Sequence, residues 1–232
     1  MKVKLISSSK PSRQLATEGI YDAQELIAFC ARVSNPSNQF NVETSEKLIR
    51  YLIKHQHWSP LEMVSACLEI TTTRDIARQI LRHRSFSFQE FSQRYADPTK
   101  DLKFVLRDAR RQDDKNRQNS IDLDIQTNDA DRFLQYQWER MQENVIEQAR
   151  NAYEWAIKSG IAKEQARAVL PEGLIESRIY MNGTLRSWIH FIELRSSNGT
   201  QKEHQLVAIE CAKVIAEIFP MAEEYVQSGQ GS

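Results

Sequence analysis

Cysteine is scarce in this sequence of 232 residues, and neither sign of charge is in excess. Cys30, Cys67 and Cys211 are odd in number, widely spaced and never paired as Cys-x-x-Cys. This pattern argues against a disulfide framework and a zinc knuckle, and it favours the reducing cytoplasm. Lysine plus arginine equals aspartate plus glutamate, with 31 of each, so the chain lacks the general basic field of nucleic-acid-binding proteins.

Long apolar runs are also absent. The opening stretch MKVKLISSSKPSRQ has too short an apolar run for a signal peptide, and no later segment reaches the length of a membrane span. Hydrophobic residues make up 41% of the chain and charged residues 27%, which suffices for a real core. We therefore expect a globular cytoplasmic protein whose partners are neither membranes nor nucleic acid.

Segments with strand and helix patterns are mixed irregularly along the chain. Strand formers dominate KVKLI, VSACLEITTT and LIESRIYMNG, and a further extended piece is expected around FSFQEFSQRY. Apolar residues at helical spacing mark AQELIAFCARV, TSEKLIRYLIKH, TLRSWIHFIELRSS and TQKEHQLVAIECAKVIAEIF, the last ending at Pro220. This mixture predicts a single α+β domain over residues 1–232, with a mixed or antiparallel sheet core packed against several helices.

One of the predicted helices is unusually long. It covers residues 130–160, and Gly160 is its expected stop. Its apolar residues recur at helical spacing and are expected to face the core: Phe133, Leu134, Trp138, Met141, Val145, Ile146, Ala149 and Trp155. The segment before it, residues 107–131, has few apolar residues and many aspartates and asparagines. We expect a solvated loop or insertion there, and it is the best candidate for disorder.

Arginines gather around one histidine between residues 74 and 94. A helix is predicted from Arg74 to about His83, and on it Arg74, Arg78 and Arg82 recur every four positions. They therefore share one face, where like charges repel by a few tenths of a kcal/mol per neighbouring pair. Something anionic should offset this repulsion.

Two kinds of anion are possible at this face. The plain interpretation is a solvated face paired with nearby acids such as Glu69, Asp75 or Glu90. The continuation of the sequence favours a bound ligand instead. Arg-His-Arg at residues 82–84 is followed, after seven residues, by Ser92 and then by Arg94. Planar guanidinium groups match phosphate oxygens with paired, charge-assisted hydrogen bonds.

The stretch RHRSFSFQEFSQR resembles the signature of the flavin-dependent thymidylate synthases, Arg-His-Arg, seven residues of any kind, and Ser. HQHWSPLEM, ARAVLP and LRSWIHFIELRSSNGTQKEHQLVA resemble further segments of that family in the same order, so the resemblance spans about residues 55–210. It implies a methyltransferase that converts dUMP to dTMP. Methylenetetrahydrofolate would donate the carbon, and FAD reduced by NADPH would donate the hydride. It also implies a homotetramer with shared active sites.

The resemblance carries over residue by residue. It implies FAD contacts at His57, Ser59, Arg82, His83, Arg84, Glu90, Thr184, Leu185, Arg186 and His190. It implies dUMP contacts at Gln79, Arg82, Glu90, Phe91, Ser92, Gln93, Arg94, Arg167 and Arg195. Arg195 is the implied catalytic residue, because its family counterpart contacts the uracil ring and favours its ionised form, as a nearby cation would. The chain departs from the family pattern at Thr184, where Asn is frequent, and at Met63, where His is frequent.

Single residues have plainer interpretations. His55 and His57 would suit a metal, but without a nearby cysteine or spaced acids such a pair is more often hydrogen-bonded or on the surface. Ser92 would suit a nucleophile, but its arginine neighbours favour a phosphate-binding hydroxyl. Core or interface packing, rather than base stacking, is the expected role of the aromatic residues Phe86, Phe88, Phe91 and Tyr95.

Two other function classes fit less well. A single-stranded nucleic-acid-binding module would explain arginines interleaved with aromatic residues, but it predicts an excess of basic charge. A cysteine-dependent thymidylate synthase would need an activated cysteine, and none of the three lies beside a convincing Pro and His pair.

Overall fold

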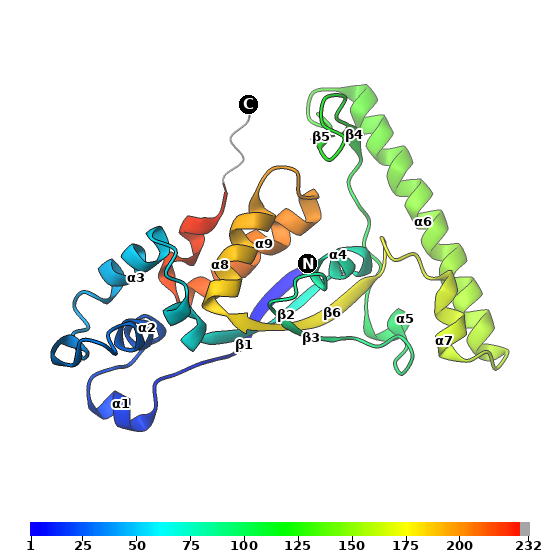
Figure 1. Ribbon diagram of the computed structural model, residues 1–232. Coiled ribbons are helices and arrows are strands. Elements are labelled where there is room, and N and C mark those ends of the chain that lie inside the picture. Colours follow the sequence, from blue (N-terminus) through cyan, green and yellow to red (C-terminus); the bar gives the residue numbers. More distant parts are fainter. Residues whose placement is uncertain (228–232) are drawn as a thin grey trace.

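The computed structural model describes residues 1–227, and its centre is a four-stranded antiparallel sheet (Figure 1). Residues 228–232 of the predicted domain lie outside the described range. The strands lie in the order β1 (Lys2–Ser8), β2 (Ser65–Thr73), β6 (Glu176–Thr184) and β3 (Ser87–Glu90). Strand β2 pairs with β6 along its whole length, which joins the two halves of the chain. The predicted fold class is confirmed.

One face of this sheet carries the main core. Ala66, Leu68 and Ile70 alternate along β2 and are buried, as the two-residue period of a strand requires. Helices α8 (Leu185–Ser196) and α9 (Lys202–Ala216) cover this face (Figure 1). The indole Nε1 of Trp188 donates to the carbonyl oxygen of Ala66 at 3.1 Å, so the largest core side chain is also satisfied.

The other helices are α1 (Arg13–Thr17), α2 (Ala23–Ala31), α3 (Ser45–Lys54), α4 (Arg74–Ile80), α5 (Pro98–Asp101), α6 (Asp129–Lys158) and α7 (Lys163–Ala166). Of these, α2, α3, α4 and α6 match predicted segments with small shifts at their ends, whereas the short helices α1, α5 and α7 were not predicted. Helix α4 ends three residues before the predicted His83, and α9 ends at Ala216 rather than next to Pro220. Strand β3 stops at Glu90, because the next residues form a turn instead of the predicted extended piece.

Helix α6 corrects one prediction about packing. Its 30 residues and its end before Gly160, which has a φ of 81°, are as expected. The stripe expected to face the core is instead largely exposed, with Met141 at 61% and Trp138 at 43%. Phe133, Leu134, Val145 and Trp155 are exposed as well. The helix stands apart from the sheet, along the right side of the view (Figure 1). Helical spacing identifies an apolar face, but it does not identify what covers that face.

The polar segment before α6 is more structured than predicted. Strands β4 (Arg110–Gln112) and β5 (Ser120–Asp122) form a hairpin beside the start of α6 (Figure 1). Arg111 pairs with Asp131 at 2.6 Å, and the backbone N–H of Ala109 donates to Gln135 at 2.7 Å. Ion pairs and hydrogen bonds hold this hairpin in place of apolar burial, which is why the composition of the segment suggests a solvated loop.

No helix within residues 1–227 is long and apolar enough to cross a membrane.

Candidate active site

The turn after α4 presents the Arg-His-Arg triplet. Ile76 and Ile80 are fully buried and fasten α4 to the core, and the chain then turns at residues 81–84. Phe86 follows and is anchored against Gly183 of β6. A Cβ at Gly183 would lie 2.4 Å from Cδ1 of Phe86, so only glycine leaves room for that ring. The position of the triplet therefore depends on a contact with the central sheet.

His83 and Arg195 meet through one hydrogen bond. Nε of Arg195, in the last turn of α8, donates to Nε2 of His83 at 2.9 Å. An accepting Nε2 requires a neutral ring, with its proton on Nδ1. Burial, and then the charge of Arg195, lower the pKa of His83 to about 4. Because its partner is neutral and no ion pair reaches it within residues 1–227, Arg195 keeps an uncompensated charge.

Four arginines around α4 divide into two pairs. Buried Arg74 pairs with Glu90 at 3.5 Å and with Glu172 at 3.1 Å. The exposed Arg78 pairs with the same two acids at 3.9 and 3.6 Å. Charge repulsion on this face is thus offset partly by Glu90, as the plain interpretation expects, and partly by Glu172, which that interpretation did not include.

Arg82 and Arg84 form the second pair, and both are exposed. Neither guanidinium forms an ion pair or side-chain hydrogen bond with another part of the described chain. Acidic neighbours therefore offset the charge of the arginines inside α4 but not the charge of Arg82 and Arg84 in the turn after it.

The turn at residues 90–94 holds five of the predicted dUMP contacts. Arg94 pairs with Glu164 at 3.1 Å, and Nε of Arg167 donates to the carbonyl oxygen of Glu164 at 3.3 Å. Two predicted dUMP contacts from distant segments therefore meet at one residue. Gln93 is buried with its Nε2 lacking a hydrogen-bond partner, which is costly unless a ligand or water fills that place.

The remaining two polar groups of this turn differ in how they are engaged. Glu90 accepts a hydrogen bond from Ser177 at 2.9 Å in addition to its arginine pairs, so its carboxylate already has partners within the described chain. Ser92 Oγ has only a long contact of 3.4 Å from the N–H of Arg94 and can still donate its own proton. The N–H of Phe91 donates to the carbonyl oxygen of Arg178 at 2.8 Å and fastens the turn to β6.

The predicted flavin contacts at the start of α8, Thr184 and Leu185, differ in how deeply they are buried. Thr184 caps the helix by accepting from the N–H of Ser187. Leu185 is fully buried, and its N–H donates to the carbonyl oxygen of Val64 at 2.9 Å. Its side chain therefore packs in the core of this chain, unlike a residue that faces a ligand.

Arg186 and His190 lie further along α8 and are more accessible. Arg186 forms an ion pair with Glu62, and the ring of His190 lies 4.4 Å from that of Trp58. Burial, and then Arg186, lower the pKa of His190. Both side chains come from one helix and meet the segment that follows α3.

His57 and Ser59 belong to that segment. Gln56, between the two histidines, has a φ of 58°, a left-handed conformation that residues other than glycine rarely adopt. Such strained positions persist where surrounding structure determines them and are frequent near functional sites. The turn leaves His57 and Ser59 exposed, and the ring of Tyr51 lies 4.3 Å from that of His55.

Residues that the sequence analysis missed lie at the start of α9. His204 is fully buried, and its Nδ1 lies 3.3 Å from Oε1 of Gln79. Nε2 of Gln79 donates to Oε1 of Gln201 at 2.8 Å. Burial, and then the charge of Arg195, lower the pKa of His204 to about 3. The sequence feature that could have pointed to these residues is a run of polar residues, Gln201 to His204, at the first turn of an otherwise apolar helix.

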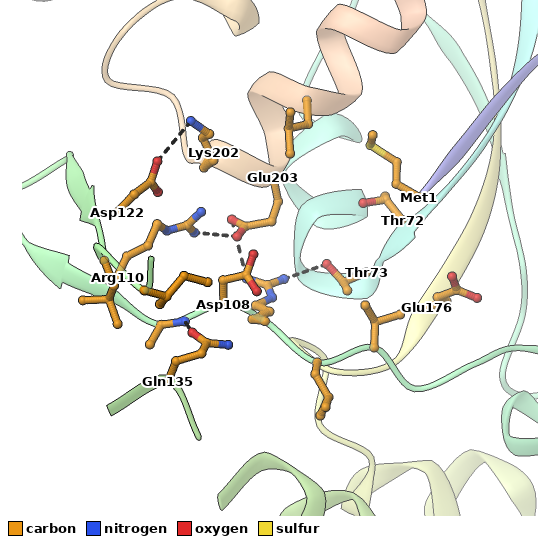
Figure 2. A pocket seen from close by; sticks show the side chains of 17 residues that line it. Met1, Thr72, Thr73, Asp108, Arg110, Asp122, Gln135, Glu176, Lys202 and Glu203 are labelled. Carbon is orange, nitrogen blue, oxygen red and sulfur yellow. Dashed lines mark hydrogen bonds and ion pairs between the residues drawn. The ribbon is translucent and has the colours of Figure 1, made fainter. Parts of the chain in front are cut away.

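A cavity of about 410 Å³ opens on the other side of this polar run (Figure 2). Glu203 of α9 and Arg110 of the hairpin point toward each other across it and form an ion pair. Arg107 joins the same wall and donates to Thr73 and Asp75 at the start of α4, at 2.6 Å each. Residues of the predicted site do not line this cavity within the described chain.

Comparison with known proteins identifies the family of this chain. A sequence profile of the Thy1 family, described as thymidylate synthase complementing protein, matches residues 17–221. The chain belongs to the Thy1 family of flavin-dependent thymidylate synthases. Its reaction is therefore the conversion of dUMP to dTMP, with FAD and NADPH as cofactors and methylenetetrahydrofolate as co-substrate, as the resemblance predicted.

Relatives match almost the whole chain. A probable flavin-dependent thymidylate synthase of Paramecium bursaria Chlorella virus 1 is 48% identical over 220 residues, which are 95% of this chain and 96% of the relative. The flavin-dependent thymidylate synthase of a Synechocystis strain is 46% identical with the same coverage. Among solved structures, the UMP/dUMP methylase PolB of Streptomyces cacaoi, bound with 5-Br dUMP, superimposes with a TM-score of 0.77. It is 25% identical, and the match covers 97% of this chain and 93% of that one.

Proposed function

We propose that the turn after α4, the turn at residues 90–94 and the end of α8 form the centre at which dUMP and FAD meet. One observation carries this assignment. Arg82 and Arg84 flank His83 in the chain, Arg195 donates to its ring, and none of the three arginines has a carboxylate partner within residues 1–227. Three unpaired cations in one place are unfavourable without an anion. Two phosphorylated ligands would supply it.

The residues present fit FAD. Arg82 and Arg84 would hold its pyrophosphate, because their exposed planar forks have no side-chain partner within residues 1–227 and match phosphate oxygens. Arg186, His190, His57 and Ser59 would line the flavin from the side of α8 and the turn after α3. When bound and reduced, FAD supplies the hydride of the reaction.

For dUMP, the phosphate would be held at the 90–94 turn. Arg94 and Arg167 would offer guanidinium forks, and Ser92 would donate its hydroxyl proton. Gln93 would complete its hydrogen bonds there, because its Nε2 is buried and unpartnered. Phe91 and Gln79 would lie along the nucleoside, and Glu90 would orient the arginines that it already contacts.

Arg195 would act on the uracil ring. Loss of the N3 proton pushes electron density toward the ring carbon that forms the new bond, and a nearby cation stabilises that charge. His83 accepts from Nε of Arg195 while remaining neutral, so it fixes the direction of the guanidinium without cancelling its charge. Arg195 is therefore the proposed catalytic residue.

We also propose that the chain, as one domain, forms a cytoplasmic homotetramer whose active sites are shared between subunits. The support is the exposed apolar stripe of α6, which includes Trp138, Met141 and Val145. Exposed apolar surface of this extent marks an interaction face. Copies of the same chain would cover it, and the free arginines after α4 would then work across a subunit boundary.

The absorbance spectrum of the purified protein tests the assignment. We expect bound flavin that bleaches with NADPH under anaerobic conditions and changes again on addition of dUMP. Arg84→Ala should lose FAD while remaining folded and assembled. Arg50→Ala is the matched control, because Arg50 is exposed, is not one of the predicted site residues, and forms its ion pairs in the described part of the chain with Glu46 and Glu224. Stoichiometric FAD in the Arg84 variant would overturn the assignment.

A further inference from the structure

A row of polar side chains connects the hairpin to Gln79. Glu203 pairs with Arg110 and accepts a hydrogen bond from Nε2 of Gln201 at 2.9 Å. Oε1 of Gln201 accepts from Gln79 at 2.8 Å, and Gln79 lies 3.3 Å from Nδ1 of His204. Each link joins a different pair of side chains, and none of them is a backbone hydrogen bond of a helix or strand.

The direction of every link follows from the charge of Glu203. Burial opposes its ionisation, but its own backbone N–H, Gln201 and Arg110 outweigh burial and lower the pKa of Glu203. An ionised carboxylate only accepts hydrogen bonds. The amide nitrogen of Gln201 must therefore face Glu203, which turns the amide oxygen of Gln201 toward Gln79.

The same reasoning continues to the histidine. Because the oxygen of Gln201 faces it, Gln79 must present its nitrogen there and its oxygen to His204. Nδ1 of His204 must then carry the proton. Nε2 of His204 is buried without a partner, and Arg195 and His83 are near, so a second proton on this ring is unfavourable. The ring is neutral, and its tautomer is set.

We infer that Glu203, Gln201 and His204 are positioning residues that hold the amide of Gln79 in one orientation, so that a single N–H of Gln79 is left to donate to dUMP. Nε2 of Gln79 carries two hydrogens, and Gln201 takes only one of them. The free hydrogen selects an oxygen acceptor and disfavours an amino group at that point of the ligand. This inference rests on the proposed placement of dUMP beside Gln79.

Nitrogen NMR of histidine-labelled protein tests the direction of this chain without measuring activity. In the parent protein we expect His204 to be neutral with its proton on Nδ1, and the signal is assigned by its loss in His204→Gln. Glu203→Gln should populate both tautomers, because a neutral amide at residue 203 no longer dictates how Gln201 is turned. A parent protein with the proton on Nε2 of His204 would overturn the inference.

Kinetics test the consequence for the substrate. Glu203→Gln should raise the KM for dUMP about tenfold and leave kcat within about twofold, as expected when one ground-state hydrogen bond is misaligned. Glu210→Gln is the matched control on the same helix, where the acid pairs only with exposed Lys213. An unchanged KM together with an unchanged tautomer in Glu203→Gln would overturn the positioning role.

Two more variants distinguish a wrong placement of dUMP from a failure of the positioning role. Gln79→Leu should raise the KM for dUMP at least as much as Glu203→Gln does. If it leaves KM unchanged while the tautomer of His204 is as expected, the placement of dUMP beside Gln79 is wrong and the positioning role falls with it. Should Glu203→Gln not fold, Gln201→Met breaks the chain at its middle link while leaving the Glu203–Arg110 ion pair in place.

Discussion

Helices α8 and α6 have similar apolar spacing and opposite environments. On α8, Trp188 and Ile192 are fully buried against the sheet, whereas Trp138 and Met141 on α6 are exposed. Helix α8 follows β6 directly, with Thr184 as both the end of the strand and the helix cap, so its apolar face returns onto the sheet. Helix α6 follows a polar hairpin that carries it away from the core. Chain connectivity thus decides which apolar face the protein covers by itself.

The contacts between these two regions are mainly polar. Arg107, before the hairpin, bonds to Thr73 and Asp75 near the start of α4, and Gln142 of α6 donates to the carbonyl oxygen of Arg107 at 2.9 Å. The small apolar cluster of Tyr153, Ala156, Ala166, Leu170 and Ile175 joins only the end of α6 to the rest. The proposed active site therefore lies in the region around α4 and α8, and α6 presents an exposed apolar face.

Charge on the exposed face of α6 should break the assembly, which is the largest effect that we expect. Met141 and Val145 would each lose about 1.5–3 kcal/mol of burial per interface, and each new carboxylate would add a desolvation cost. We expect the double variant Met141→Asp, Val145→Asp to sediment as smaller, folded species at micromolar concentration. Glu147→Lys, on the other side of the helix, is the control. An unchanged sedimentation coefficient in the double variant would refute the α6 interface.

Loss of Arg195 should damage the chemical step, whereas the α6 variant damages assembly. Arg195→Ala should lower saturated turnover about a hundred- to a thousand-fold, because a group that stabilises developing charge matters more in the transition state than in the ground state. Arg195→Lys keeps the charge without the planar fork and should restore activity only partly. Both are measured with the flavin already reduced, so that NADPH oxidation does not limit the rate.

The split between turnover and binding decides the role of Arg195. If Arg195→Ala weakens dUMP binding while saturated turnover stays near that of the parent, the residue only binds substrate. Sedimentation of this variant should match the parent, because Arg195 lies on α8 and not on the exposed face of α6.

The sequence predicted the fold correctly where an apolar pattern packs against elements that lie next to it along the chain or in the sheet. Alternation in residues 65–73 and the spacing in residues 185–196 predict elements that do pack on each other. The signature around His83 and Ser92 predicted the family, because it fixes chemistry and spacing together. The exposure of the apolar face of α6 could not be predicted, since helical periodicity is the same for a face that its own chain buries and for one that it leaves exposed.

Individual contacts in the site show the same limit. Arg82 and Arg84 have no ion-pair partner within residues 1–227, and Leu185 is buried in the core, and neither fact could be read from the sequence pattern. His204 gave little signal, since a single histidine on an apolar helix is more often a core residue with satisfied hydrogen bonds. Its role depends on side chains from three distant segments, and that juxtaposition appears only in the fold.

Gly183→Ala should disturb the packing between β6 and α8 while leaving α6 unchanged. The new Cβ would lie 2.4 Å from a ring atom of Phe86, whose ring already packs 4.8 Å from that of Trp188. Overpacking of this kind costs about 1–3 kcal/mol of unfolding free energy, measured by urea denaturation. Gly173→Ala is the control, because nothing lies within 4 Å of its Cβ. FAD content should also fall, since Phe86 anchors the turn that carries Arg84. Equal stabilities of the two variants would contradict this account.

Ser92 should give the smallest effect, because its side chain makes a single neutral contact within residues 1–227. Its turn is fastened to β6 by Phe91 and to α7 by the pair of Arg94 and Glu164. A hydroxyl that donates to phosphate contributes about 0.5–1.5 kcal/mol, or somewhat more with a charged partner, so Ser92→Ala should weaken dUMP binding about three- to tenfold. Turnover at saturating dUMP should remain measurable, because the arginines still hold the phosphate. A covalent nucleophile would behave in the opposite way, since its loss removes the main chemical route while leaving the binding groups in place. Equilibrium binding of dUMP and single-turnover rates with reduced flavin distinguish the two. Intact binding with no turnover would make Ser92 a nucleophile and would end its assignment as a phosphate ligand.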